Sequence, residues 1–462
     1  MIKIVLIVVT FIFLGCGSSK SDDRSNIRTY STDQNNTKPK EVVSTKSVKT
    51  LTIYVHGYDP KGYKRVGAFG NDNYDKVIDK MVEFTGFSTT QNYSKDSKNI
   101  IAITPYYGNI TPSYYTPKDE DDLKNIGKGV PRYSLIIAKF ARHMLKETNS
   151  TKLNIVSASM GSLVTRYLIE KDLEHIRSDK LIKKWLSLEG VIKGNIGASD
   201  EKLYRIVNAF EEQPFEVSQM TYSWIKNQFG DSLENLKDID IAFESSTKDN
   251  LNNKAITYLT NEANDGVQAV KDTYIDGYAH TYFHETHTSL DKRDSAWAYA
   301  STFLTSSKRV KITLIEATLE NLHEDDLGLG DFLSKSILPA EVVFESRVYS
   351  PKAMQKWGFN GAIDERLFDG HYLNLYKYDE ASKPKELNNM LFNSTVIDNE
   401  DELKLVITPY EIDVDKLYGV NQPAGHKDKE TLESATVTVP LENGIYDIRS
   451  SEWSGRVKVE VY

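Results

Sequence analysis

Cysteine is almost absent from this sequence, and positive charge is in the minority. The single cysteine, Cys16, means that no disulfide can form within the chain. The formal net charge is −9 at pH 7, which argues against a nucleic-acid-binding protein because such proteins usually carry a basic face. The apolar run at residues 4–14 is broken only by Thr10 and is too short to span a bilayer as a helix.

The rest of the composition is that of an ordinary folded protein. Hydrophobic residues make up 39% of the chain and charged residues 27%, values typical of a soluble globular protein with a core. The length of 462 residues favours two folded domains. The sequence contains no internal repeat.

The first sixteen residues are organised like a secretory signal, since Lys3 precedes the apolar run and Gly15 ends it before Cys16. The sequence Phe-Leu-Gly-Cys at 13–16 resembles the lipobox of bacterial lipoproteins, with Phe where that family usually has Leu. The resemblance implies a signal peptide at 1–15, acylation of the Cys16 thiol, and attachment to a membrane surface outside the cytoplasm. A plain cleaved signal with an incidental cysteine is the alternative.

The residues after Cys16 predict a tether. Gly17 and Ser18 come first, and an aspartate there would indicate inner-membrane retention in some bacteria, so the outer membrane is favoured. Residues 16–48 are mostly Ser, Asn, Asp, Lys and Thr and cannot bury enough apolar surface to offset the entropy of ordering. We therefore expect a flexible link between the lipid and a folded protein.

Residues 49–306 alternate between short apolar runs and helical periods, which predicts a mostly parallel sheet with helices on both faces. Between residues 200 and 253 the alternation gives way to a mostly helical, polar insertion, which we expect to form a cap or lid. The expected strands lie at 51–55, 100–104, 153–156, 185–188 and 255–260, and the clearest helices at 160–171 and 295–304.

Residues 309–462 are different in character, because short β-rich runs follow one another with turn residues between them. This pattern predicts an all-β sandwich as a second domain. Glu324, Asp325, Asp326 and Asp331 could supply oxygen ligands for calcium, with a solvated loop as the alternative. The β-rich runs lie at 311–315, 341–344, 372–376, 403–408, 436–439 and 456–462.

At residues 153–164 an expected strand runs straight into an expected helix, and Ser159 lies at the turn. Such a turn needs small residues two positions before and after the serine, because its backbone is strained. Ser157 and Gly161 meet this need, although the usual first residue is glycine. A serine placed there becomes a nucleophile when a base takes its proton. The N–H of Met160, at the helix start, can then stabilise a developing oxyanion.

A second oxyanion donor is expected after the first strand, where His56, Gly57 and Tyr58 follow in succession. The glycine lets the backbone approach another segment closely. This sequence resembles the His-Gly oxyanion motif of lipases and esterases, which makes the N–H of Tyr58 the candidate donor. A turn that only closes the strand is the alternative.

The acid should follow the serine, and the histidine should follow the acid. Asn-Asp-Gly-Val at 264–267 comes after an expected strand and resembles the acid loop of many lipases, in which Asp265 would orient the histidine. A simple Asp-Gly turn is the alternative. Glu189, directly after the strand at 185–188, is the reserve acid. Asp238 and Asp240 lie in the expected insertion and fit the role less well.

The candidate histidines His280, His284 and His287 lie close together in the sequence. His287 is the predicted base, because His-Thr-Ser-Leu before a closing helix resembles the terminal histidine loop of lipases. His284 is the runner-up. Such a cluster also raises the possibility of a metal site, but the His-Glu-x-x-His pattern of metalloproteases is missing here, and no metal is predicted.

Together these motifs make residues 51–305 resemble lipases and esterases of the α/β-hydrolase fold. The resemblance implies carboxylic-ester hydrolysis through an acyl-enzyme, with a Ser159–Asp265–His287 triad, no cofactor, and an ester or lipid as substrate. An acyltransferase or thioesterase on the same fold is one alternative. A non-catalytic surface-binding lipoprotein is the other, and Ser157 in place of glycine is the one hint of a decayed site.

Overall fold

The fold is known from a computed structural model, which describes residues 48–58, 72–103, 111–200, 204, 214–230, 233–249, 262–320, 340–368, 373–412 and 429–462. The expected signal peptide, Cys16 and the tether up to residue 47 lie outside these residues. So do the expected strand at 255–260 and the calcium candidates Glu324, Asp325, Asp326 and Asp331. The predictions for these segments stay predictions.

The centre of the molecule is a run of parallel strands in the order β7-β6-β5-β4-β1-β3-β2. All residues of β1 are buried, as expected of strands covered on both faces. The strands are β1 (Thr50–Val55), β2 (Ser88–Thr89), β3 (Asn99–Ile103), β4 (Lys152–Ala158), β5 (Ile182–Leu188), β6 (Asp240–Ser246) and β7 (Ala279–Phe283).

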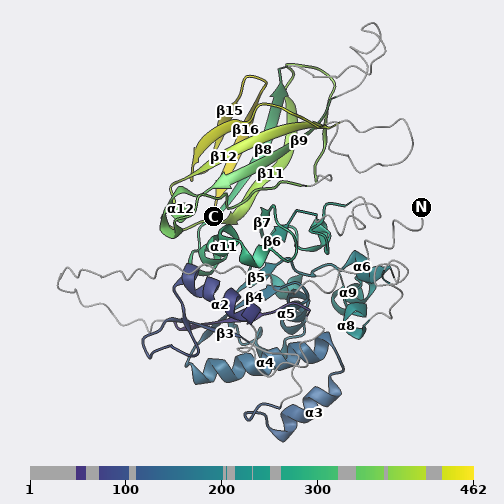
Figure 1. The fold of residues 1–462 in the computed structure, drawn as a ribbon, viewed down its shortest axis with the longest axis vertical. Coiled ribbons are helices and arrows are strands. Elements are labelled where there is room, and N and C mark those ends of the chain that lie inside the picture. The colour runs from purple at the N-terminus through teal and green to yellow at the C-terminus, as the bar shows by residue number, and fades with distance from the viewer. Residues whose placement is uncertain are drawn as a thin grey trace, which may run out of the picture.

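Helices cover both faces of this sheet (Figure 1). α4 (Val130–Glu147) and α5 (Met160–Glu170) share an apolar cluster with Leu51 and Ile53 of β1. α2 (Asp72–Thr85) and α11 (Asp294–Thr305) share another cluster with Tyr54, the next residue along the same strand. Successive side chains of a strand point to opposite faces, so the two clusters lie on opposite sides. The predicted mostly parallel sheet with helices on both faces is confirmed.

Beyond residue 308 the described chain forms antiparallel strands and the short helix α12 (Pro351–Trp357). One layer is β15-β16-β8-β11 and the other is β10-β9-β12-β13, with β14 paired to β12. A shared apolar core that includes Leu314, Phe344 and Trp453 fills the space between them, which confirms the predicted all-β sandwich. The strands are β8 (Arg309–Leu319), β9 (Ala340–Tyr349), β10 (Tyr376–Tyr378), β11 (Lys385–Thr395), β12 (Glu402–Ile412), β13 (Lys429–Thr431), β14 (Ala435–Pro440), β15 (Gly444–Arg449) and β16 (Trp453–Val461).

One layer of the sandwich, β15-β16-β8-β11, continues the parallel strands in a single sheet, which the sequence does not predict. β11 pairs antiparallel with β7 where Asn393 faces His280. Asn393 also donates from Nδ2 to the carbonyl of Tyr278 at 3.0 Å, and Ser394 Oγ donates to the carbonyl of His280 at 3.1 Å. The result is a single 11-stranded sheet from β15 to β2.

The expected insertion over 200–253 is wrong at its C-terminal end, because β6 occupies the middle of the sheet between β5 and β7. The polar residues Glu244, Ser245 and Ser246 hide this strand in the sequence, yet all of them are buried. Helices do occupy the earlier part of the region. The helical segments there include α8 (Phe215–Ser218), α9 (Tyr222–Phe229) and η4 (Glu234–Leu236), and α6 (Ile196–Ser199) comes directly before the region.

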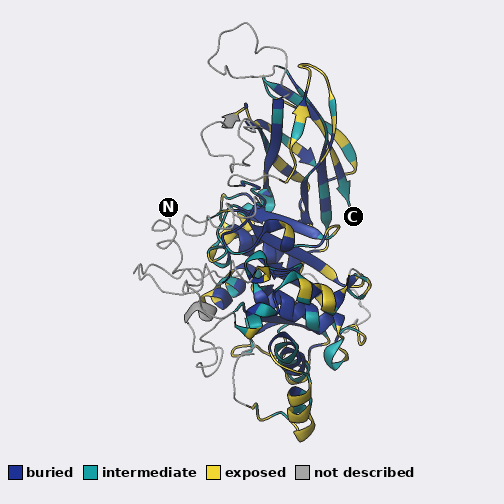
Figure 2. Cartoon of the chain, turned by 90° about the vertical axis from the view of Figure 1, so that its right-hand side faces the viewer, coloured by how far each residue is buried: buried dark blue, intermediate teal, exposed yellow. Residues whose placement is uncertain are grey.

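The remaining helices are peripheral. α3 (Pro117–Asn125) buries only Leu123 and is the exposed helix at the lower end of Figure 2, where buried residues otherwise concentrate in the sheet and its neighbours. None of the described helices has the length and apolar character needed to cross a bilayer. Single 3₁₀ turns form η3 (Leu173–His175), η5 (Val270–Asp272) and η6 (Leu290–Lys292).

Candidate active site

Ser159 lies between β4 and α5 with an unusual backbone conformation. Its φ is 49° and its ψ is −126°, a region that residues with a Cβ avoid. The Ser159 carbonyl accepts the N–H of Ser162 at 3.0 Å and that of Val191 at 3.1 Å, which holds the turn in place. Strained backbone of this kind concentrates at functional sites, and its position matches the predicted strand–turn–helix.

Two glycines let other backbone segments approach this turn. A Cβ on Gly161 would lie 2.4 Å from the carbonyl oxygen of His56 and 2.5 Å from that of Val55. A Cβ on Gly57 would lie 2.9 Å from the Cβ of Ser159. Side chains cannot be accommodated at such distances, so both positions require glycine. The predicted His-Gly segment therefore lies directly against the predicted nucleophile.

The unusual Ser157 is explained by its surroundings. Its Oγ accepts a hydrogen bond from Nε1 of Trp185 at 2.8 Å and lies 3.0 Å from Oγ of Ser162. Ser187 Oγ in turn donates to Ser162 Oγ at 2.9 Å. A buried hydroxyl with partners carries little cost, so serine is accommodated where glycine is usual. Ser157 is therefore no sign of decay.

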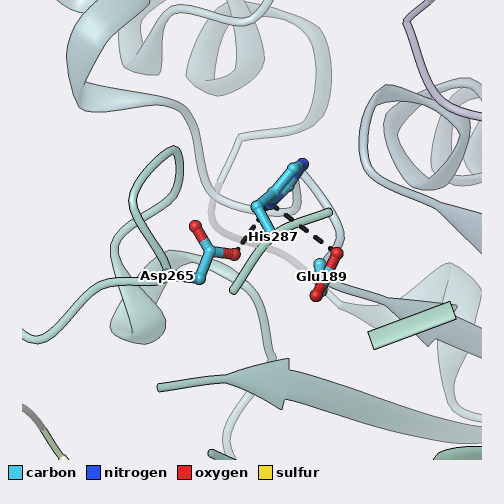
Figure 3. Close-up of side chains that lie close together, drawn as sticks. All are labelled: Glu189, Asp265 and His287. Atoms are coloured by element: carbon cyan, nitrogen blue, oxygen red, sulfur yellow. Dashed lines mark hydrogen bonds and ion pairs between the residues drawn. The ribbon is translucent and has the colours of Figure 1, made fainter. Parts of the chain in front are cut away.

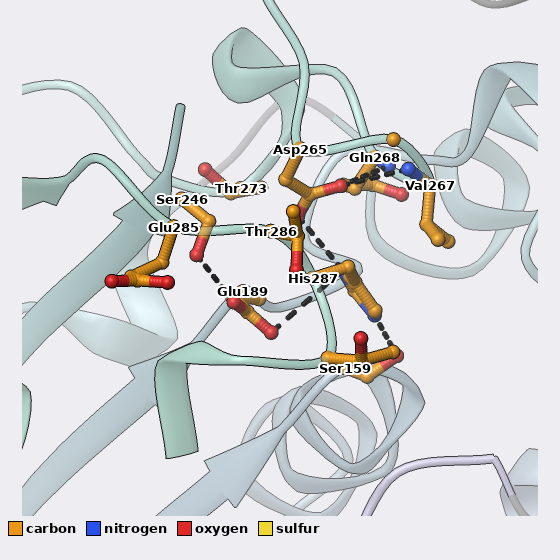
Figure 4. A network of polar contacts seen from close by, with 12 residues as sticks. Ser159, Glu189, Ser246, Asp265, Val267, Gln268, Thr273, Glu285, Thr286 and His287 are labelled. Atoms are coloured by element: carbon orange, nitrogen blue, oxygen red, sulfur yellow. Dashed lines mark hydrogen bonds and ion pairs between the residues drawn. The ribbon is translucent and has the colours of Figure 1, made fainter. Parts of the chain in front are cut away.

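Side chains from separate loops meet beside the turn (Figure 4). Ser159 Oγ lies 3.0 Å from Nε2 of His287, and Nδ1 of His287 lies 2.7 Å from Oδ2 of Asp265. Asp265 lies in the connection between β6 and β7, and His287 follows β7, so both come from the edge where parallel strands end. The structure thus brings together the predicted nucleophile, acid and histidine.

The contact with Asp265 places a proton on Nδ1 of His287 and orients the ring. Asp265 is buried, and its Oδ1 accepts the N–H groups of Val267 at 2.9 Å and Gln268 at 2.7 Å, which fixes the carboxylate. Burial acts to lower the pKa of His287, but the charge of Asp265 and the hydrogen bond to it outweigh burial and raise that pKa above its usual value. Nε2 is then free to accept the proton of Ser159.

A second carboxylate, Glu189, lies beside the same histidine (Figure 3). It follows β5 with a φ of 49°, its Oε2 is 3.8 Å from Nδ1 of His287, and Oγ of Ser246 donates to its Oε1. Burial, reinforced by the charge of Asp265, raises the pKa of Glu189 well above its usual value. Of the two carboxyl groups, Asp265 makes the closer contact with Nδ1 of His287, at 2.7 Å against 3.8 Å for Glu189.

The other sequence candidates have different partners. Nδ1 of His284 contacts the carbonyl of Leu367, and Nε2 of His280 lies 2.8 Å from Oγ of Ser245. Asp240 is the first residue of β6 and exposed, so it lies at the opposite end of a parallel strand from the site. These contacts leave His287 as the histidine that faces Ser159.

The two candidate oxyanion donors flank the turn. Met160 is the buried first residue of α5, so its N–H is at a helix N-terminus, where negative charge is stabilised. Tyr58 follows Gly57 and packs against the apolar cluster that contains α5. Their backbone positions next to Ser159 suit the predicted role.

Two groups of side chains in the described chain place acidic or imidazole atoms close enough together for a metal ion. One is the group drawn in Figure 3, whose histidine is already engaged on both nitrogens. The other consists of Asp119, Asp122 and Glu174. Lys139, itself buried, lies among these acids, with Nζ 2.5 Å from Asp119 and 2.7 Å from Glu174, and supplies the positive charge that an ion would.

No protein-family model and no curated protein matches the sequence. Among solved structures, the lipase BlEst2 of Bacillus licheniformis shares 12% identity over 54% of this chain and 88% of its own, with a TM-score of 0.35. The phospholipase PlaB of Legionella pneumophila shares 9% identity over 78% and 86%, with a TM-score of 0.34. Carboxyl esterase 2 of Tuber melanosporum shares 11% identity over 44% and 60%, with a TM-score of 0.24.

The pKa of His287 should lie above the ordinary histidine value of about 6.5, because Asp265 stabilises the protonated ring. Asp265→Asn removes that charge and should lower the pKa. Glu189→Gln leaves the closer carboxylate, Asp265, in place and should keep the pKa of His287 above the ordinary value. NMR titration of ¹⁵N-histidine-labelled protein, assigned with His287→Ala, measures all of these values. A larger fall in Glu189→Gln than in Asp265→Asn would make Glu189 the charged partner.

Proposed function

We propose that this chain is a serine hydrolase that cleaves carboxylic esters through an acyl-enzyme. The observation that carries the proposal is the continuous hydrogen-bond chain from Ser159 through His287 to Asp265, built on a strained turn that exposes the serine. A hydroxyl, a base and an orienting carboxylate in this order are the parts that activate a serine nucleophile. The fold is one that also carries other chemistries, so the proposal depends on the site.

The reaction follows from the geometry. His287 Nε2 takes the proton of Ser159 as Oγ attacks the ester carbonyl, and Asp265 stabilises the imidazolium that forms. The N–H groups of Met160 and Tyr58 hold the oxyanion of the tetrahedral intermediate. The imidazolium then protonates the leaving alcohol, and the acyl group stays on Ser159. Water, deprotonated by His287, releases the acid and restores the serine.

The proposed setting is the cell envelope. The sequence around Cys16 favours a lipid anchor, which would hold the enzyme at a membrane surface outside the cytoplasm, with the outer membrane favoured. A surface-bound ester hydrolase meets lipid esters at high local concentration. We therefore propose a lipid or another carboxylic ester as its substrate.

The first prediction of this proposal concerns the nucleophile. A fluorophosphonate probe should label the wild-type protein covalently, and Ser159→Ala should abolish the labelling because Oγ is the atom that attacks. His287→Ala should lower ester turnover by about 10⁶-fold, as loss of a triad base does. His284→Ala should keep most of the turnover, because its ring contacts Leu367. Turnover is measured with soluble p-nitrophenyl esters of different chain length.

For each protein in this experiment, one result would contradict the proposal. If the folded wild-type protein stays unlabelled, the proposal that it is a serine hydrolase is wrong. If Ser159→Ala is still labelled, Ser159 is not the nucleophile. If ester turnover falls more in His284→Ala than in His287→Ala, His287 is not the base. Adding acceptor alcohols or thioester donors to the same assay separates hydrolysis from acyl transfer and thioester cleavage.

The second prediction concerns the anchor. The full chain, expressed in a bacterial host that matures lipoproteins, should incorporate a clickable palmitate analogue and enter the detergent phase of Triton X-114. Cys16→Ala removes the thiol that carries the lipid, and should lose the label and move to the aqueous phase. Wild-type protein without label, or Cys16→Ala with undiminished label, would contradict anchoring at this cysteine.

A further inference from the structure

The loop that carries His287 is held from two sides. Residues 284–293, which we call the histidine loop, connect β7 to α11. On one side the backbone N–H of His287 donates to the carbonyl of Asp265 at 3.0 Å. The contacts on the other side come from residues 359–368, between α12 and β10 of the sandwich. We call these residues the docking segment.

Within the histidine loop, Glu285 is the central acceptor. Its Oε2 accepts the hydroxyl of Ser289 at 2.8 Å, and its Oε1 lies 2.5 Å from Nη1 of Arg293. Oγ of Ser289 also accepts the backbone N–H of Thr286 at 2.9 Å, and Thr286 is the residue just before His287. Arg293 is thus linked, through two side chains, to the backbone that aims the imidazole.

Glu365 of the docking segment contacts both the strand and the loop. Its N–H donates to the carbonyl of Tyr282 at 2.7 Å, and its Oε2 accepts the N–H of His284 at 3.3 Å. Its Oε1 lies 2.5 Å from Nη2 of Arg293, so the guanidinium bridges Glu365 and Glu285 through different nitrogens. The side chain of Glu365 is only 12% exposed and that of Arg293 34%, and charge-assisted bonds gain strength when shielded from water.

The docking segment is itself fixed to the sandwich. Ile363 donates its N–H to the carbonyl of Val348 in β9 at 2.7 Å, and Val348 donates back to Asp364 at 2.8 Å. Arg366 turns the chain with a φ of 45° and places its guanidinium 4.4 Å from the ring centre of Tyr282 in β7. A movement of β9 against β7 would therefore be transmitted to Glu365.

We propose that Glu365 is a positioning residue for the reaction at Ser159. It holds Arg293, and through Glu285 the histidine loop, in the arrangement that keeps His287 against the serine. The sandwich is then a component of the active site. This inference rests on the proposed function, because positioning has meaning only if His287 acts as the base. Loss of Glu365 removes no reacting group, but a displacement of about 1 Å at a reacting group can slow a reaction about 100-fold.

Replacement of Glu365 tests the inference in the full chain. Glu365→Ala should lower kcat for a soluble ester roughly 100-fold and leave KM within about twofold, because orientation and not binding is lost. Glu365→Gln keeps the shape and the acceptor for the His284 N–H but loses the charge, and should lose about tenfold. The matched control is Glu316→Gln, which breaks the exposed pair with Arg456 between β8 and β16 and should keep wild-type kcat.

A double variant tests the route through Arg293. If Glu365 acts through the guanidinium, Glu365→Ala combined with Arg293→Ala should be no slower than the slower single variant. Losses that multiply would overturn the route. Rates are measured well below the melting temperature of each variant, and Glu365→Gln carries the test if Glu365→Ala does not fold.

The remaining outcomes separate this inference from the proposed function. Wild-type protein that does not react with fluorophosphonate contradicts the proposed function. A reactive, Ser159-dependent wild type whose kcat is unchanged in Glu365→Ala contradicts the positioning role alone. A rise in KM at constant kcat also overturns it, because that result would place Glu365 in substrate binding.

Discussion

The positive φ at Ser159 is the constraint on which the rest of the site depends. A non-glycine residue held in such a conformation costs roughly 1–3 kcal/mol and persists only where the surrounding structure determines it. Here the approach of the backbone at His56 makes a Cβ at Gly161 impossible, and the turn itself excludes one at Gly57. The end of β1, Ser159 and the start of α5 are therefore held together. The hydroxyl is exposed toward the one edge of the sheet where an acid and a histidine can reach it.

The parts of the site that the sequence predicts are those with local conformational requirements. The turn at Ser159 needs small residues two positions before and after the serine. The acid loop needs glycine after Asp265, where Gly266 has a φ of 89°. The choice of His287 over His284 depended on a resemblance, because the physical reason is not local. β7 ends at Phe283, so His284 follows the strand directly. Its Nδ1 contacts the backbone carbonyl of Leu367, which is more than 80 residues away along the chain. Contacts of that range leave no pattern in a single sequence.

Two of the strands that the sequence does not predict, β6 and β11, bury polar side chains. β6 contains Glu244, for whose carboxylate no hydrogen-bond partner is found among the described residues. Burial raises the pKa of this carboxyl well above its usual value, because the protein interior disfavours its charged form. β11 buries Asn389 and Asn393, whose amides donate to the carbonyls of Phe344 and Tyr278 at 3.1 and 3.0 Å. Hydrophobic periodicity detects strands whose buried positions are apolar. It fails for strands whose buried positions are polar side chains that form tertiary hydrogen bonds.

The pairing of β11 with β7 gives the sandwich a physical role in the half of the chain that contains Ser159. Without β11, β7 would be the edge strand of the parallel sheet, with unpaired backbone groups along its length. The histidine loop starts at the end of that strand, and edge elements belong to the least stable parts of a fold. The structure covers this edge twice, with β11 at Asn393 and with Glu365 at Tyr282. Both contacts come from the chain beyond residue 308. The position of His287 opposite Ser159 therefore depends on segments from both halves of the chain.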